Sequence, residues 1–408
     1  MSIKSLLKIK YLIHNTILVL LLIATSGVPF FVGSYFLMPL SFIYAIYIAY
    51  IRRIKLIDSA LISILLFLLS IVNLRELVHG YFPSLYENLV VILKYTFSYI
   101  VLKILAYNFI ERYIKVMYYI ALSSLTFFSL FNLFPELESH FRSSITPFFT
   151  ISTKGGFYEY APNFILYTFS ERGRNAGPFW EPGGFVVFLT IALIFRLFQK
   201  RNLFNKQGVV LLLGLITTFS TAGYVALFFI MLAYTFSLRK RIYIYMLIPV
   251  MIIISINAYQ KLDFLQNKVS THLSTIESNY EGRVANRFTS ILIDLDRIIK
   301  NPLLGNPVGA SGEYTIYSHR NNGLSSMAVS YGLVYFLLYF WLVYKGFRQL
   351  QLLYGSKNRV SLILSVLAVF AFFFGQVLTD KPVVNALAMM PFILSNSYIK
   401  RLKLSISK

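Results

Sequence analysis

The sequence predicts an all-α membrane protein, a bundle of about twelve transmembrane helices. Of its 408 residues, 57% are hydrophobic and only 13% are charged, and the mean hydropathy is +0.67. A soluble domain of this length cannot hide so much apolar surface in one core. The net charge of +22 is divided among short basic groups between apolar stretches. It therefore indicates membrane topology and gives no sign of nucleic-acid binding.

Apolar stretches of roughly 16 to 20 residues, the length that a bilayer requires of a helix, recur along the whole chain. They form one integral membrane domain over residues 1–408, and the chain has no cysteine for disulfides or thiolate metal sites. The predicted spans lie near residues 13–32, 34–51, 58–74, 88–108, 116–134, 183–198, 208–221, 223–237, 242–259, 324–344, 360–378 and 383–399.

The seventh and eighth spans share only 30 positions, residues 208–237. The polar stretch from Thr217 to Gly223 divides them, so the sequence also fits two short or re-entrant helices that line a cavity. Either arrangement leaves the following spans with the same orientation.

Orientation follows from the basic residues. Alternating the connections between two sides places 23 of the 38 Lys and Arg residues on one side and 13 on the other, with Lys94 and Lys103 inside the fourth span. Because basic residues in short connections stay in the cytoplasm, both termini are expected there. The basic, then apolar N-terminus resembles a signal peptide, but because many spans follow it we expect an uncleaved first helix.

Two long polar stretches, residues 135–182 and 260–322, hold eleven of the sixteen acidic residues. The same alternation makes both of them external loops that face one compartment. Since charge is costly inside a bilayer, the chemistry of the protein is expected in these loops.

The first long loop leads into the sixth span through a helix start. Glu181 followed by Pro182 is typical of a helix N-terminus, because proline is favoured at the first helical position and an acid opposes the positive end of the dipole. Gly183 and Gly184 leave the N–H groups of the first turn open, which is how helix N-termini receive phosphate oxygens.

Two arginines precede this helix start. Arg172 and Arg174 carry guanidinium groups, which bind phosphate in a bidentate fork. Together with the helix N-terminus they indicate a diphosphate site at the membrane surface. A second interpretation is that Glu181 only caps the helix, Trp180 anchors at the interface, and the arginines touch lipid headgroups.

The second long loop contains a predicted amphipathic helix over about residues 281–300. Its charged opposite face predicts that it lies on the membrane or docks over the bundle. Arg283 and Arg287, one turn apart, project together, and Arg297 continues roughly that side; a solvated or lipid-touching basic face is the alternative. The apolar face comprises Val284, Phe288, Ile291, Leu292, Leu295, Ile298 and Ile299.

Two further features of this loop bear on chemistry. Asp294 and Asp296 match a metal-binding D-x-D pattern, but on a helix they point about 200° apart and cannot hold one ion. His319 lies just before the tenth span, where it could accept a proton from a sugar hydroxyl. A structural role for this single histidine is the alternative.

Four short stretches carry a resemblance to a known family. They are Arg174 to Pro182, Gly282-Arg283 followed by Asn301 to Gly305, His319 to Asn322 followed by Gly332, and Thr218 to Tyr224. They resemble motifs of the O-antigen polymerase and ligase superfamily, bacterial membrane glycosyltransferases of the C-type fold that use undecaprenyl-diphosphate-linked oligosaccharides. The chain departs from that pattern at Ala222, where the family usually has arginine, and at Arg320, which separates His319 from the asparagines.

The resemblance implies a polymerase that joins lipid-linked repeat units at the periplasmic face of the inner membrane, without a divalent metal or cofactor. The implied partners are the undecaprenyl-diphosphate-linked oligosaccharide, membrane lipids and a chain-length regulator. Four residues would be catalytic. Arg174 and Arg283 would hold the diphosphate, and His319 or Glu181 would orient or deprotonate the acceptor hydroxyl. Five more would bind diphosphate or sugar: Arg172, Arg287, Arg320, Gly183 and Gly184.

Two other functions stay open. A ligase that moves finished glycan onto lipid A core shares these motifs. A transporter or flippase of lipid-linked oligosaccharides also fits twelve spans with both ends inside. Carriers need polar or charged groups near mid-membrane, where only Lys94 and Lys103 qualify, so the sequence disfavours the transporter.

Overall fold

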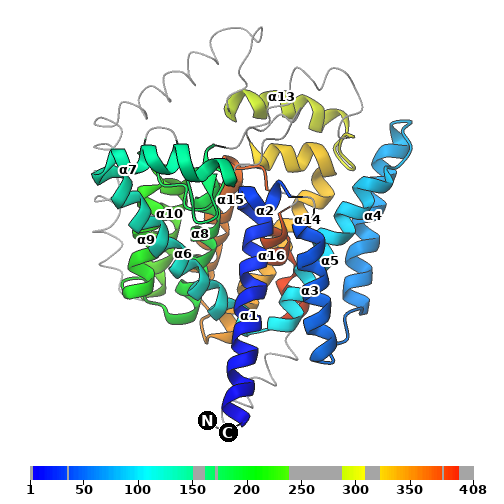
Figure 1. The fold of residues 1–408 in the computed structure, drawn as a ribbon. Coiled ribbons are helices and arrows are strands. Elements are labelled where there is room, and N and C mark those ends of the chain that lie inside the picture. Colours follow the sequence, from blue (N-terminus) through cyan, green and yellow to red (C-terminus); the bar gives the residue numbers. More distant parts are fainter. Residues whose placement is uncertain are drawn as a thin grey trace.

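The structure is a computed structural model that describes residues 3–34, 36–149, 161–170, 173–238, 287–307, 322–378 and 381–394. Helices make up nearly all of its regular structure (Figure 1). In chain order the elements are α1 (Ile3–Gly27), α2 (Pro29–Val32), α3 (Leu37–Ile51), α4 (Ser59–Val78), α5 (Leu85–Leu105), α6 (Asn108–Leu133), α7 (Pro135–His140), the π-helical turn η1 (Phe141–Ile145), the 3₁₀ turn η2 (Thr146–Phe148), β1 (Asn163–Phe164), β2 (Tyr167–Thr168), α8 (Pro182–Lys200), α9 (Lys206–Thr217), α10 (Thr221–Ser237), α13 (Arg287–Lys300), α14 (Gly323–Leu353), α15 (Arg359–Gly375) and α16 (Pro382–Ile393).

Five helices in the described part of the chain are long and apolar enough to cross a bilayer: α4, α5, α6, α8 and α14. Shorter apolar stretches of 10–17 residues lie in α1, α3, α9, α10, α15 and α16. The predicted bundle of apolar helices is therefore present. The span near residues 242–259 lies outside the described residues, and the count of twelve stays a prediction.

The predicted break between the seventh and eighth spans is present. Helix α9 ends at Thr217 and α10 begins at Thr221, with Phe219 in a left-handed conformation between them (φ +46°). The 12 residues of α9 measure about 18 Å, less than the roughly 30 Å hydrocarbon core of a bilayer. This geometry supports the reading of α9 as a short helix.

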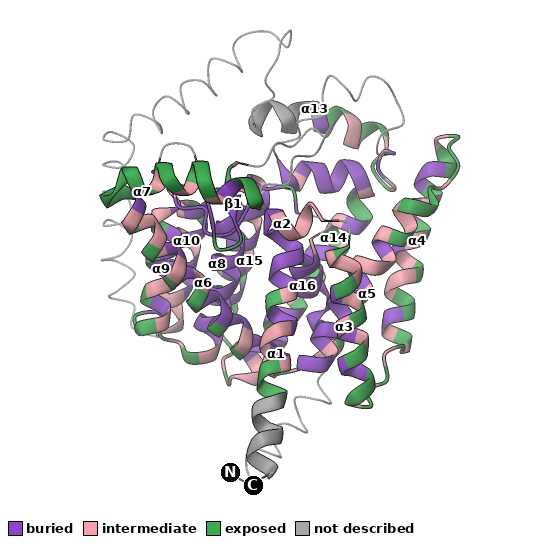
Figure 2. Ribbon diagram, viewed as in Figure 1, coloured by how far each residue is buried: buried purple, intermediate pink, exposed green. Residues whose placement is uncertain are grey.

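Helix α8 lies at the centre of the bundle, and Figure 2 shows it almost wholly buried. Every residue from Pro182 to Phe198 is buried, because α6, α9, α10 and α15 pack around it. A helix that is apolar on all sides can be surrounded by protein or by lipid, and the packing of these four helices surrounds α8 with protein. The core therefore forms around the helix that the first long loop leads into.

Connections between helices gather at two opposite ends of the bundle (Figure 1). At one end, Arg201 after α8 donates from Nη2 to the carbonyl of Gly355 after α14, at 2.6 Å. At the other end, the Val383 amide in α16 donates to Ser26 Oγ in α1, at 2.8 Å. We call the end at which α8, α10, α14 and α16 begin the loop end. Alternate connections thus lie at alternate ends, as the sequence predicts.

Lys103 lies near the last turn of α5, away from the loop end. Its Nζ pairs with Asp58 Oδ2 at 2.5 Å, and the Tyr99 hydroxyl donates to the same carboxylate. Burial opposes ionisation of Asp58, but the hydrogen bonds from Lys103, Leu61 and Tyr99 outweigh it and lower the pKa of Asp58. Lys103 therefore belongs to an ion pair at a helix start and not to the middle of a span.

Helix α14 is broken at Gly332, where φ is +77°. The break frees backbone groups, and the stretch Asn301 to Gly305 with its neighbour Asn306 binds two of them. The Asn306 amide donates to the Val329 carbonyl at 2.6 Å, and the Leu333 amide donates to the Pro302 carbonyl at 2.7 Å. Two stretches that carry the family resemblance are thus joined by hydrogen bonds.

Helix α13, the described part of the predicted amphipathic helix, packs on α14 at the loop end (Figure 1). Asp294 is buried and accepts from Ser325 Oγ at 2.6 Å, whereas Asp296 is exposed and pairs with Lys300 at 2.8 Å. The two aspartates point to different sides, as predicted. Of the predicted apolar face, Leu295 and Ile299 are exposed, whereas Ile291 and Ile298 are partly buried. Residues 281–286 lie outside the described residues.

Candidate functional site

The stretch from Arg174 to Pro182 is held against the break between α9 and α10. The Asn175 amide donates to the Thr217 carbonyl at 3.0 Å, and its side-chain Nδ2 donates to Thr217 Oγ1 at 2.9 Å. Arg174 Nε donates to the Thr218 carbonyl at 3.2 Å. These bonds fix the orientation of the Arg174 guanidinium and bring together two of the stretches singled out in the sequence.

Asn175 is the fixed point of this loop. It is fully buried, and its Oδ1 accepts hydrogen bonds from Ser124 Oγ at 2.8 Å and from the Gly177 amide at 3.0 Å. A buried amide side chain with partners on both sides resists rotation. No pattern in the sequence predicted a role for Asn175, because its partners in α6 and α9 lie far from it in the chain.

The predicted helix start is confirmed. Pro182 is the first residue of α8, and Glu181 precedes it in an extended conformation (φ −161°, ψ 165°). The Glu181 side chain makes no hydrogen bond to its own helix. Instead its Oε1 accepts from Nε2 of Gln376, which follows the last residue of α15.

Gln376 connects the two long loops. Its side chain lies where a Cβ of Gly183 would be, and its carbonyl lies where a Cβ of Gly323 would be. Gly323 begins α14 directly after Asn322, whose Oδ1 caps the helix by accepting from the Leu324 and Ser325 amides at 3.0 and 3.1 Å. The end of the first long loop and the end of the second therefore meet at one residue, the first at its side chain and the second at its carbonyl.

The predicted span near residues 360–378 included Gln376, whereas the helix itself ends one residue before it. Helix α15 ends at Gly375, and Gln376 is extended (φ −149°, ψ 137°) and buried. The sequence could not show the difference, because Val377 and Leu378 continue the apolar run beyond the end of the helix.

Gly183 and Gly184 are both buried at the start of α8. A Cβ on Gly184 would meet the Trp180 ring at 2.8–3.0 Å, and a Cβ on Gly183 would collide with Gln376. These contacts give both glycines a packing role that the sequence did not indicate. The predicted phosphate contacts of their N–H groups stay a prediction.

Lys381 adds a cation at the same place. It directly precedes α16, and its Nζ lies 5.6 Å from the centroid of the Trp180 ring, close enough for a cation–π contact. Sequence reasoning assigned it to an external connection and gave it no further role. Within the described residues, the site therefore consists of Arg174, Trp180, Glu181, Gln376 and Lys381.

Four predicted site residues lie outside the described residues: Arg172, Arg283, His319 and Arg320. Arg287 is described only as the first residue of α13, without its side chain. The predicted convergence of arginines from both loops therefore stays a prediction.

A buried ion cluster at the loop end was missed. Helix α4 continues to Val78, four residues beyond the predicted end of the third span, and carries Arg75 fully buried. Arg75 Nη2 pairs with Glu76 at 2.6 Å and with Glu87 at 2.8 Å, and Nη1 donates to the Ser330 carbonyl beside the α14 break at 2.8 Å. The predicted third span ended at residue 74, so Arg75 was expected in the connection that follows and not in a helix.

Removal of Gln376 gives a local test of this site. We expect Gln376→Ala to destabilise the protein by about 1 kcal/mol, because Glu181 loses its donor and Gly183 loses its packing partner. Gln376→Glu places a second carboxylate there, so its thermal midpoint should rise relative to Gln376→Ala as the pH falls from about 8 to about 5 and the two carboxyls share a proton. Thermal unfolding in detergent measures both; equal midpoints at both pH values would contradict the contact.

No protein-family model, curated protein or solved structure matches this chain. The function is therefore inferred from the residues of the loop end and their geometry.

Proposed function

We propose that the protein is a membrane glycosyltransferase that polymerises lipid-linked oligosaccharide repeat units at the loop end, which faces the periplasm. The observation that supports this most is the meeting of separate stretches there. Arg174 bonds to Thr218, and Glu181 is linked through Gln376 to the start of α14. Gly305 packs against the break at Gly332.

The proposed topology follows from charge. The opposite end carries Arg52, Arg53, Arg201, Lys357 and Arg359, in line with a cytoplasmic location. Both termini then lie in the cytoplasm and the protein resides in the bacterial inner membrane.

In the proposed reaction, an acceptor sugar hydroxyl attacks the anomeric carbon of the donor glycan. The bond from that carbon to the diphosphate oxygen breaks, and undecaprenyl diphosphate leaves with the electron pair. The proton of the hydroxyl passes to His319 or Glu181. Negative charge grows on the diphosphate, and preorganised cations stabilise that change most effectively where water is sparse.

The cations of this proposal are Arg174 and Arg283, with Arg172, Arg287 and Arg320 in support. The bond from Arg174 Nε to Thr218 supports the first assignment, because a guanidinium held at one nitrogen is oriented before the substrate arrives. Lys381 beside Trp180 is a further cation for the leaving group.

Purified protein supplied with lipid-linked repeat units tests the function. We expect chains of several units from wild type, and a loss of about tenfold or more in Arg174→Ala, because one preorganised donor to a developing anion is worth at least that much. Activity is expected to persist in a metal chelator.

Arg142→Ala is the matched control. Arg142 lies in the same loop but pairs with Glu138 on the surface at 2.7 Å, so its loss should leave the rate unchanged. Normal polymerisation by Arg174→Ala would remove this arginine from the mechanism. Transfer only when lipid A core is added would identify a ligase.

A lipid-linked oligosaccharide transporter is the second candidate, and the Arg75 cluster favours it, because buried charges in membrane helices mark ion or substrate pathways in carriers. Movement of lipid-linked units across vesicles without any change in chain length would decide for the transporter.

A further inference from the structure

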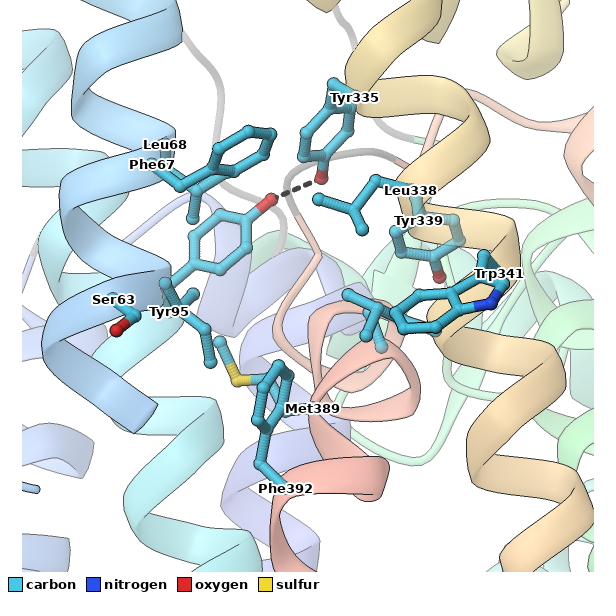
Figure 3. Close-up of a pocket in the computed structure, with 13 residues that line it drawn as sticks. Ser63, Phe67, Leu68, Tyr95, Tyr335, Leu338, Tyr339, Trp341, Met389 and Phe392 are labelled. Atoms are coloured by element: carbon cyan, nitrogen blue, oxygen red, sulfur yellow. Dashed lines mark hydrogen bonds between the residues drawn. The ribbon is translucent and has the colours of Figure 1, made fainter. Parts of the chain in front are cut away.

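A cavity of about 180 Å³ lies between α4, α5, α14 and α16, apart from the site described above. Figure 3 shows side chains from these helices converging on it. The residues at its mouth are exposed: Ser63, Trp341 at 52% and Phe392 at 39%. Those on its floor, among them Tyr95 and Met389, are buried. The cavity therefore opens on the outer surface of the bundle and narrows inward.

The lining is apolar, and its polar atoms are bonded to protein. The hydroxyls of Tyr95 and Tyr335 lie 2.6 Å apart (Figure 3), and the Tyr339 hydroxyl donates to the Val384 carbonyl at 3.0 Å. None of the thirteen lining residues is charged. An engineered apolar cavity of about 150 Å³ stays dry and accepts benzene, so this pocket suits a hydrocarbon and not water.

The residues around the mouth indicate that the hydrocarbon comes from the bilayer. Ile62 and Leu66 on α4 and Leu337 on α14 are all exposed, and these helices are apolar enough to lie in a bilayer. The medium at the mouth is then lipid. Helix α4 packs mainly on α5 and hardly on α14, and the pocket is lined by residues from both α4 and α14.

Charge argues against the tail of a diphosphate lipid. Arg75 lies seven residues beyond Leu68, two turns along the same face of α4, toward the loop end. There it is bonded to both Glu76 and Glu87, so the cluster has two carboxylates for one guanidinium. A dianionic headgroup above the pocket would meet this excess of negative charge.

We propose that this pocket binds one acyl chain of a bilayer phospholipid, which fills the space between α4 and α14. The proposal goes beyond the proposed function and does not depend on it. The bound chain packs against the Tyr95–Tyr335 pair and joins α4 to the rest of the bundle.

The test uses wild-type protein in phosphatidylcholine vesicles that contain a phosphatidylcholine with a diazirine at the end of one acyl chain. After irradiation, mass spectrometry locates the labelled residues. We expect label on the floor residues Tyr95 and Met389, which lipid around the protein cannot reach because both are buried. Exposed Leu337 should be labelled in any case and serves as the internal reference.

Ser63→Phe closes the mouth, and we expect it to lower the floor label about fivefold or more relative to Leu337. Ser70→Phe is the matched control, since Ser70 is exposed on α4 but does not line the pocket. Ala388→Leu fills the pocket from the opposite helix and should act as Ser63→Phe does. Unlabelled floor residues in wild type would overturn the proposal, and so would loss of label on addition of an equal amount of polyprenyl phosphate.

Discussion

Arg75→Ala is expected to destabilise the protein by about 3 to 5 kcal/mol, because it leaves the buried carboxylate of Glu76 and the half-buried carboxylate of Glu87 without their partner. Arg75 is fully buried and binds Glu76, Glu87 and the Ser330 carbonyl. Its loss removes the side-chain bonds that connect α4 to α5 and to the broken helix α14. The expected result is a large fall in the thermal midpoint of the detergent-purified protein.

Arg142→Ala provides the comparison for this prediction as well. Its ion pair with Glu138 is largely exposed, so its removal should cost less than about 1 kcal/mol. Arg75→Lys keeps the charge but cannot bind three acceptors with a planar fork, and should fall between the two. Equal midpoints for Arg75→Ala and Arg142→Ala would show that the cluster contributes little to stability.

Gly332→Ala is expected to cost about 3 kcal/mol or more, because two penalties add. The first is the left-handed backbone (φ +77°), which a Cβ disfavours. The second is a collision, since a Cβ would press on the Leu303 carbonyl and approach the Leu304 amide to 2.8 Å. The substitution should therefore loosen the stretch Asn301 to Gly305 from the break in α14.

Gly80→Ala separates the two penalties. Gly80 has nearly the same backbone angle (φ +78°), but nothing lies within 4 Å of a Cβ there. It should cost only about 1 to 2 kcal/mol. The difference between the unfolding free energies lost in Gly332→Ala and in Gly80→Ala gives the cost of the collision. If both variants lose the same stability, the contact between the loop and the break is not tight.

The course of the helices could be predicted from the sequence, since long apolar runs end at polar residues and Pro182 marks a helix start. What failed was the assignment of single polar residues near helix ends. Arg75 indicated the end of a span, but its partners Glu87 and Ser330 are 12 and 255 residues away. Only the folded structure brings Glu87 and Ser330 close enough to Arg75 to offset the cost of burying its charge.

The candidate site was predicted in part for the same reason. Glu181 and Arg174 were found from their local pattern of proline, glycine and arginine. Gln376 and Lys381 were not, because a single glutamine or lysine between two apolar runs has no pattern of its own. Their importance arises from a contact between the start of α8 and the end of α15.

The burial of α8 on every side has a consequence for biosynthesis. A helix that leaves the translocon early is first surrounded by lipid acyl chains. In the folded protein, α9, α10 and α15 pack on α8 and replace those lipid contacts. Its neighbour α15 begins at Arg359, more than 150 residues after α8 ends at Lys200. Until that late segment is synthesised, α8 remains open to lipid on one flank, and its final environment is completed only after α15 has been made.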